Sequence, residues 1–159
     1  MPLFDRLILL LATGLGLGLI PGAPGTFGTL LGIPLAWVFA RPGIFINSLS
    51  LLAFAALSVW IAGKAEVIFQ KHDAQNIVID EVAGIAVTLF LIPFSYKTAI
   101  AGFLLFRFFD IVKLGPVKWA DNRLSGGFGI VADDLLAGVF ANLSLRILLW
   151  VFPALGMAA

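Results

Sequence analysis

The amino-acid sequence predicts an all-α fold: an integral membrane bundle of several helices, some short or broken, with its polar loops on one side. The first supporting observation is composition, because 61% of the 159 residues are hydrophobic and only 12% are charged. Soluble domains have about 45–50% apolar and about 25% charged residues. A soluble core of this size cannot enclose so much apolar surface, so lipid must cover part of it. The length suits a single domain, residues 1–159.

The second observation is a series of five apolar stretches, which lie at residues 7–20, 27–40, 44–62, 82–109 and 135–152. The first two are short, and the Pro- and Gly-rich segment 21–26 between them cannot be helical throughout. They predict two half-length or tilted helices that flank a loop. The N-terminal stretch lacks a small-residue cleavage signature, which favours mature protein over a signal peptide.

The other three stretches predict full spans and a hairpin. A span needs about 20 apolar residues, which residues 44–62 and 135–152 approach, with only Arg146 interrupting the latter. Residues 82–109 are too many for one span and are broken by Pro93-Phe94-Ser95-Tyr96-Lys97. We therefore expect a helical hairpin, with residues 81–92 leading out and residues 98–113 leading back. Arms this short need a thinner bilayer or burial within the protein.

The charged residues are distributed unevenly between the two ends of these helices. Under this topology one end holds eight of the nine acids: Glu66, Asp73, Asp80, Glu81, Asp110, Asp121, Asp133 and Asp134. The same end holds most of the cations: Lys64, Lys71, Arg107, Lys113, Lys118 and Arg123. An excess of Lys and Arg marks the cytoplasmic side of a membrane protein. The net charge of +1 argues against nucleic-acid binding, which needs a basic surface.

Acids on three separate segments suggest a metal site. Asp80-Glu81 precedes one apolar helix, Asp110 lies in another, and Asp133-Asp134 precedes the last. Grouped carboxylates repel one another unless a cation neutralises them, and Mg²⁺ prefers oxygen ligands. The simpler alternative is that acids at helix starts complement the helix dipole or cap the helix.

Cations and glycines beside these acids suggest a phosphate ligand. Arg107, Asp110 and Lys113 share one helical face at a spacing of three, which also fits a plain row of salt bridges that reaches the interface. The turn at residues 24–29 leads into a helix N-terminus, which attracts anions, although Thr26 as a helix cap explains it equally well. Arg123 and the glycines at 126–129 provide a further charge and close backbone approach. His72, the only histidine, is interpreted as a loop residue.

Missing motifs narrow the chemistry. There is no Asp-x-Asp-x-Thr/Val nucleophile loop, and the absence of cysteine excludes thiolate nucleophiles and zinc–thiolate sites. Metal-assisted displacement by an activated water remains, and whether an aspartate becomes transiently phosphorylated stays open. Two other classes stay open: a small ion or proton transporter that uses the acids as a relay, and a non-catalytic assembly subunit that packs through its glycines. The transporter predicts acids near the middle of the bilayer, whereas these lie at helix ends.

Several motifs in order resemble the bacterial phosphatidylglycerophosphatase A family. The matching segments are PGAPGTFGTL (21–30), HD (72–73), IVIDEVAG (77–84), FRFFDIVK (106–113), DNR (121–123) and GGFGIVADD (126–134). One departure is Leu114, where the family commonly has proline directly after the lysine. The resemblance implies a Mg²⁺-dependent enzyme of the inner membrane, facing the cytoplasm. It would convert phosphatidylglycerophosphate to phosphatidylglycerol and phosphate, and its oligomeric state is left open.

The residues expected to carry this chemistry form two groups. Catalysis and Mg²⁺ binding are expected at Asp80, Glu81, Asp110, Asp133 and Asp134. Phosphate or substrate binding is expected at Gly25, Thr26, Gly28, Thr29, Arg107, Lys113, Asp121, Arg123 and Gly127.

Overall fold

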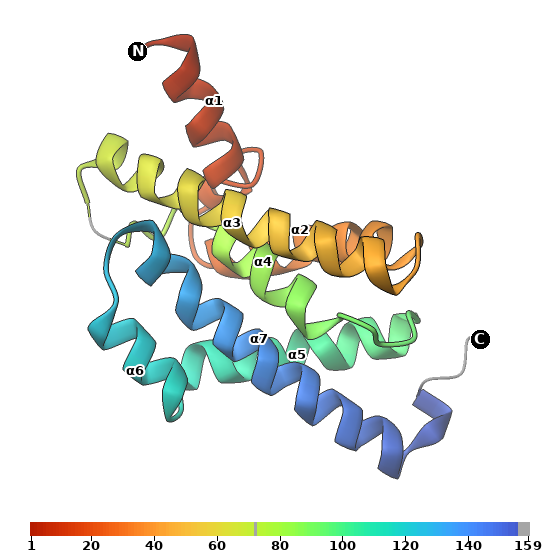
Figure 1. The fold of residues 1–159 in the computed structure, drawn as a ribbon. Coiled ribbons are helices and arrows are strands. Elements are labelled where there is room, and N and C mark those ends of the chain that lie inside the picture. The colour runs from red at the N-terminus through yellow and green to blue at the C-terminus, as the bar shows by residue number, and fades with distance from the viewer. Residues whose placement is uncertain (72, 156–159) are drawn as a thin grey trace.

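The computed structural model describes residues 1–71 and 73–155, and within them it contains seven α-helices and no β-strand (Figure 1). The elements, in chain order, are α1 (Leu3–Ala12), η1 (Leu17–Leu19), α2 (Pro24–Ala40), α3 (Ile44–Phe69), α4 (Ile79–Thr88), α5 (Tyr96–Val112), α6 (Pro116–Arg123), α7 (Gly126–Val151) and η2 (Pro153–Leu155).

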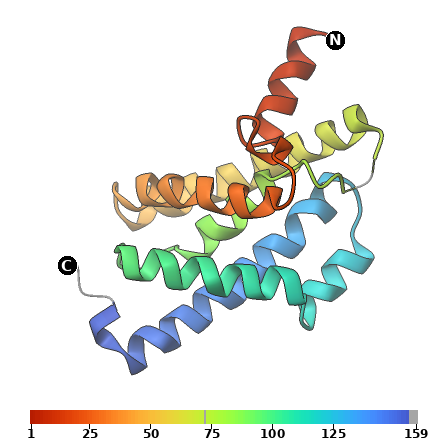
Figure 2. The same cartoon turned by 180° about the vertical axis from the view of Figure 1, so that it is seen from behind.

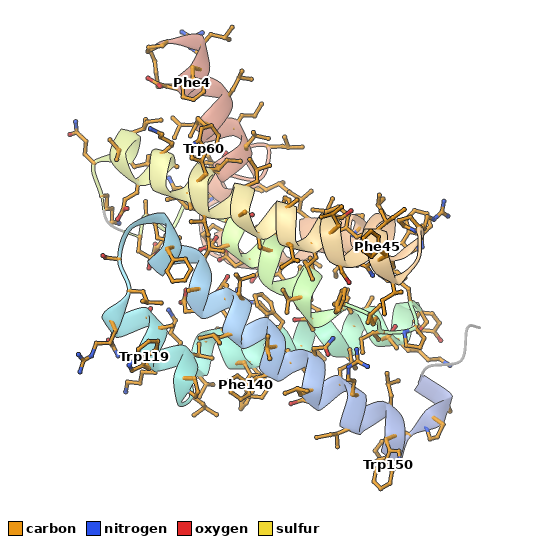
Figure 3. All side chains as sticks on the ribbon, viewed as in Figure 1. Phe4, Phe45, Trp60, Trp119, Phe140 and Trp150 are labelled. Atoms are coloured by element: carbon orange, nitrogen blue, oxygen red, sulfur yellow. The ribbon has the colours of Figure 1, made fainter. Side chains whose placement is uncertain are left out.

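The two longest helices, α3 and α7, are each 26 residues long and apolar enough to cross a membrane. Only 17% of the most apolar part of α3 and 33% of that of α7 is buried inside the protein. Large apolar side chains instead point outward, and Trp150, 84% exposed, stands clear of the bundle in Figure 3. Such surfaces require lipid contact, so the predicted all-α membrane bundle is confirmed.

The short helix α4 lies in the centre of the bundle and packs mainly against α2 and α7. Eight of its ten residues are buried. A β-carbon on Gly138 of α7 would overlap the carbonyl oxygen of Gly84, so only glycine lets the two helices approach this closely. Burial between α2 and α7 therefore satisfies this ten-residue helix, which is too short to cross a bilayer by itself.

The C-terminal end of α4 is satisfied by polar side chains of α7. The amide nitrogen of Asn142 donates to the carbonyl oxygens of Thr88 at 2.8 Å and Phe90 at 2.9 Å. Arg146 Nη2 donates to the same Phe90 oxygen at 3.1 Å. Free carbonyls at a helix end need such donors, which gives Arg146 a structural role.

The predicted hairpin is confirmed, although both helices begin two residues earlier than expected and the first ends at Thr88 and not at residue 92. Its first arm is α4 and its second is α5, which starts with a capping box in which Ser95 and Thr98 bond each other's backbone N–H groups. Two short helices that flank a loop are also found, as α1 and α2, but α1 ends at Ala12, so residues 13–20 of the first predicted stretch lie outside it, and α2 starts within the predicted loop. Figures 1 and 2 show α1 projecting at an angle from the other helices.

Two local predictions are wrong. Thr26 does not cap α2, because that helix already starts at Pro24, whose missing N–H suits the first helical position. Asp133 and Asp134 do not precede α7, because the glycine-rich segment before them is itself helical from Gly126. Helix α3 explains this: a β-carbon on Gly127 would overlap the α3 backbone at Val59 and Gly63.

The chain folds so that one end of the bundle collects the helix termini rich in polar residues. The N-termini of α2, α4 and α7 and the C-termini of α3 and α5 lie together there, beside α6, at the left in Figure 1. The one-sided arrangement of the polar loops follows from this antiparallel packing.

Candidate functional site

Three acids meet where the first turn of α4 faces α7. Asp80, Glu81 and Asp134 each place one carboxylate oxygen within 4.8 Å of the others. We call these three residues the acid cluster. Asp80 and Asp134 are buried and Glu81 is half-buried.

One oxygen of each acid in the cluster lacks a hydrogen-bond partner within the described part of the chain: Asp80 Oδ1, Glu81 Oε2 and Asp134 Oδ2. A buried carboxylate without a partner is strongly destabilising. Three carboxylates that converge from two helices, each with an oxygen left over, suit a hard divalent cation, which takes oxygen ligands and neutralises their charge. The residues present therefore fit Mg²⁺.

The protonation of the cluster agrees with this fit. Burial raises the pKa of the Asp80 carboxyl well above its usual range, and the adjacent Glu81 and Asp134 carboxylates raise it further. Burial likewise raises the pKa of Glu81 to about 7, although its hydrogen bond to Asp80 and the charge of Arg107 oppose the rise. Bare acids packed this closely tend to hold protons, and a bound cation would favour their ionised forms.

Arg107 and Asp110 of α5 form an ion pair beside the cluster. Arg107 Nη1 donates to Asp110 Oδ2 at 2.6 Å. Gly25, at the N-terminus of α2, lies against this pair and the cluster: a β-carbon there would overlap Glu81 Oε1 and lie 3.0 Å from Arg107 Nη1. The absence of a side chain at this position keeps the guanidinium and the carboxylate in place.

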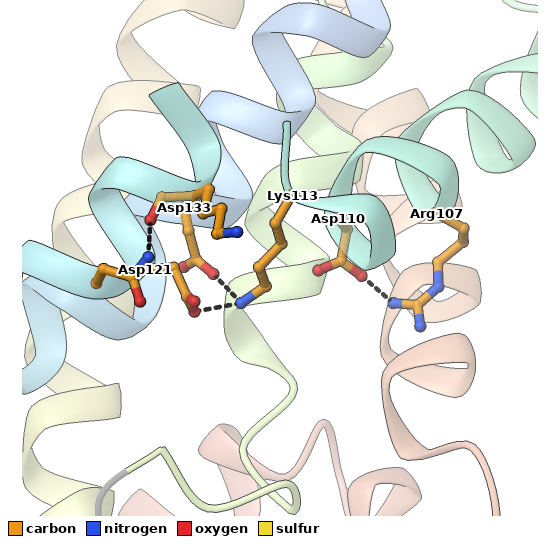
Figure 4. A network of polar contacts seen from close by, with 7 residues as sticks. Arg107, Asp110, Lys113, Asp121 and Asp133 are labelled. Carbon is orange, nitrogen blue, oxygen red and sulfur yellow. Dashed lines mark hydrogen bonds and ion pairs between the residues drawn. The ribbon is translucent and has the colours of Figure 1, made fainter. Parts of the chain in front are cut away.

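Lys113 ends α5 in a left-handed conformation, with φ at +47°, which turns its side chain toward α6 and α7. Its Nζ donates to Asp133 Oδ2 at 2.8 Å and to Asp121 Oδ1 (Figure 4). Partial burial lowers the pKa of Lys113, but its bonds to Asp121 and Asp133 outweigh that effect and raise it above the usual value. Lys113 is therefore a permanently charged group.

These residues line one cavity of about 470 Å³ at the polar end of the bundle. Its wall includes all five predicted acids, together with Arg107, Lys113, Gly25 and Thr26. The N-terminus of α2, which carries a partial positive charge, forms one side. A cavity with a buried acidic floor and two fixed cations can bind a metal ion together with an anion such as phosphate.

The other predicted site residues lie away from this cavity. Gly28 packs against Val78 of the loop before α4, and Thr29 Oγ1 donates to the carbonyl oxygen of Gly25 at 2.8 Å. Gly127 packs against α3, and Arg123, the last residue of α6, is exposed. Asp121 reaches the cavity only through Lys113. His72 falls outside the described residues.

The cavity also has lining residues to which the sequence analysis gave no role, among them Asp73, Gln75 and Ile111. The signal for Asp73 is its place in the polar loop that leads into α4. Ile111 carries no such signal, because the sequence does not distinguish the apolar residues of α5 that line the cavity from those that face outward.

Comparison with known proteins finds one family model, described as Phosphatidylglycerophosphatase A, which matches residues 10–149. A protein named Phosphatidylglycerophosphatase A from Haemophilus influenzae is 40% identical over 134 residues, covering 83% of this chain and 82% of that protein. Its namesake from Escherichia coli K12 is 35% identical over 133 residues, covering 83% and 77%.

A third relative, from Bacteroides thetaiotaomicron, is 36% identical over 150 residues, covering 89% of this chain and 93% of that protein. Its name provisionally assigns it a phosphatidylinositol-3-phosphatase activity. No solved structure matches the chain.

Proposed function

Because the chain belongs to the phosphatidylglycerophosphatase A family, we propose that it hydrolyses phosphatidylglycerophosphate to phosphatidylglycerol and phosphate, with Mg²⁺ as cofactor. The observation that supports the cofactor is the set of three buried, unpartnered oxygens in the acid cluster. Family membership supports the substrate, since two relatives carry that activity in their names.

In this proposal the acid cluster holds the metal from the first turn of α4 and from α7. Bound Mg²⁺ would neutralise phosphoryl charge and polarise the phosphorus–oxygen bonds. Asp110, held by Arg107 at the edge of the cluster, completes the acidic floor. Because α4 is packed on both sides by protein, the cluster is held rigidly, and rigid positioning is a main source of rate in phosphoryl transfer.

The substrate's terminal phosphate would lie between the acid cluster and Lys113. The Lys113 ammonium and the N-terminus of α2 both favour an anion there. A water oxygen attacks phosphorus, the bond from phosphorus to the glycerol oxygen breaks, and inorganic phosphate leaves. A carboxylate of the acid cluster orients the water and accepts its proton, and the glycerol oxygen takes up a proton.

We further propose that the protein is a multi-pass protein of the bacterial inner membrane, with this cavity facing the cytoplasm. The spans α3 and α7 support the membrane location. The excess of Lys and Arg at the cavity end supports the orientation.

The test is phosphate release from phosphatidylglycerophosphate by the purified protein in detergent, with Mg²⁺ or with EDTA. We expect activity only with Mg²⁺. Asp80→Asn, Asp110→Asn and Asp134→Asn should each reduce turnover by about 100-fold or more, because each removes charge from the metal site. Asp5→Asn, on α1 and remote from the cavity, is the matched control. Full activity of all three variants, or full activity in EDTA, would reject the assignment.

A further inference from the structure

The two fixed cations of the cavity lie at different depths. Arg107 lies in α5 and Lys113 is the residue that caps its C-terminus, six positions later, so their backbone positions are about 9 Å apart along the helix axis. Figure 4 shows Asp110 between them, with Arg107 and Lys113 on either side. Lys113 lies at the end of α5 beside α6, and Arg107 lies further into the bundle.

Arg107 borders the surface of α5 that faces lipid. Leu104, Phe108 and Ile111 form an exposed apolar stripe along that helix, and they are 61%, 51% and 68% exposed. Ile111 belongs to both surfaces, because it also lines the cavity. The cavity wall at Arg107 therefore continues into the lipid-facing stripe of α5.

Lys113 borders the polar side of the cavity. Its two partners are Asp121 on α6, whose side chain is 34% exposed, and Asp133 on α7. Along α5 toward the polar end of the bundle the order is therefore Arg107, then Asp110 beside the acid cluster, then Lys113. The apolar stripe runs alongside this series from Leu104 to Ile111.

The geometry points to two separate phosphate subsites, one at Arg107 and one at Lys113. We propose that Arg107 binds the phosphodiester that joins the diacylglycerol to its headgroup, and that Lys113 binds the terminal phosphomonoester. This inference rests on the proposed function and deepens it. The ligand class is a glycerophospholipid with a diester near its tails and a monoester further out, and that order matches the order of the two cations.

The guanidinium of Arg107 has donors left for this role. Its Nη1 bonds Asp110, and among the described residues no partner is assigned to its Nη2 or Nε. A guanidinium has five N–H donors in a planar fork that suits phosphate oxygens. Asp110 thus orients the guanidinium of Arg107 and leaves N–H donors for an anion on the side of the apolar stripe.

Two subsites give a rule for substrate choice. A lipid with both phosphates contacts both cations, whereas phosphatidate has a single monoester directly on its diacylglycerol and contacts only one. Arg107 is therefore a specificity-determining residue that acts mainly on substrate binding.

The test compares phosphatidylglycerophosphate with phosphatidate in the same Mg²⁺-containing micelles. Arg107→Gln should raise KM for phosphatidylglycerophosphate about tenfold or more, as expected for the loss of charge-assisted hydrogen bonds. The ratio of kcat/KM for the two lipids should fall by a similar factor, and Arg107→Lys should restore part of it. Lys113→Gln, the matched control, should lower kcat/KM for both lipids alike. An equal loss for both lipids in Arg107→Gln, or no loss, would overturn the inference.

A binding measurement separates this inference from the proposed function. Phosphatidylglycerol has the diester but no monoester, so its affinity for the detergent-solubilised protein should fall about tenfold in Arg107→Gln and little in Lys113→Gln. If wild-type protein binds phosphatidylglycerol through Arg107 but releases no phosphate from phosphatidylglycerophosphate, the proposed function fails and the subsite stands. If phosphate is released but neither affinity nor selectivity depends on Arg107, the subsite fails alone.

Discussion

Asp133 and Asp134 are neighbours in the sequence but serve different parts of the cavity. Successive residues of an α-helix point about 100° apart. On α7 this directs Asp134 toward the acid cluster and Asp133 toward Lys113. The doublet predicted as a pair of metal ligands thus divides into one member of the cluster and one partner of a lysine.

Their variants should therefore behave differently. Asp134→Asn should lower turnover by about 100-fold or more, because it removes charge from the proposed metal site. Asp133→Asn should lower turnover about tenfold through a less well-oriented Lys113, while the Mg²⁺ concentration for half-maximal activity stays near the wild-type value. Phosphate release measured across a Mg²⁺ titration checks both. A large shift in the Mg²⁺ requirement of Asp133→Asn would show that this residue binds the metal after all.

Gly25 is the second residue at which a small change should matter. In Gly25→Ala the new methyl group would overlap Glu81 Oε1 and crowd Arg107, so the acid cluster would have to shift. We expect activity to fall at least about tenfold, since small displacements of catalytic groups are costly, with little loss of thermal stability in detergent.

The control for Gly25→Ala is Gly43→Ala. Gly43 has a φ of +89° and open space around it, so alanine there adds backbone strain at the far end of the bundle. It should lower the melting temperature and spare activity. Full activity of Gly25→Ala would show that the close approach of α2 to the acid cluster is not needed to position Glu81 and Arg107.

Helix α4 depends on close contact with its neighbours. Gly138→Val would push α7 away from Gly84, and overpacking of this kind costs about 1–3 kcal/mol. Its melting temperature in detergent should fall clearly below that of Leu143→Ala, which changes an exposed, lipid-facing residue of the same helix. Equal melting temperatures would contradict the tight packing of α4 against α7.

The sequence predicted the presence of the helices better than the residues at which they begin and end. Long apolar stretches and the break at Pro93 marked α3, α7 and the hairpin, because hydrophobic length and proline act locally. The start of α7 at Gly126 was missed, since glycines normally favour turns and only the packing of Gly127 on α3 makes them helical. Asp110 was placed near the acid cluster correctly, but its pairing with Arg107 in preference to Lys113 depends on tertiary contacts.

The proposed orientation of the bundle in the membrane can be tested directly. The chain has no cysteine, so single cysteines introduced by Lys118→Cys and Arg41→Cys give unambiguous labels. These exposed residues lie at opposite ends of the bundle. In intact cells a membrane-impermeant maleimide should label position 41 and spare position 118 until the cells are opened. The reverse pattern would place the cavity outside the cytoplasm.

The position of Ile111, in the cavity wall and in the apolar stripe of α5, bears on the route by which a lipid reaches the cavity. Because one wall of the cavity passes into the apolar stripe of α5, a lipid can arrive and depart sideways while its tails remain among their neighbours. Encounters then occur by two-dimensional diffusion within one leaflet. The rate of turnover should accordingly follow the mole fraction of substrate within the micelles or vesicles. Diluting those micelles or vesicles with buffer, at a constant mole fraction, should change the rate little.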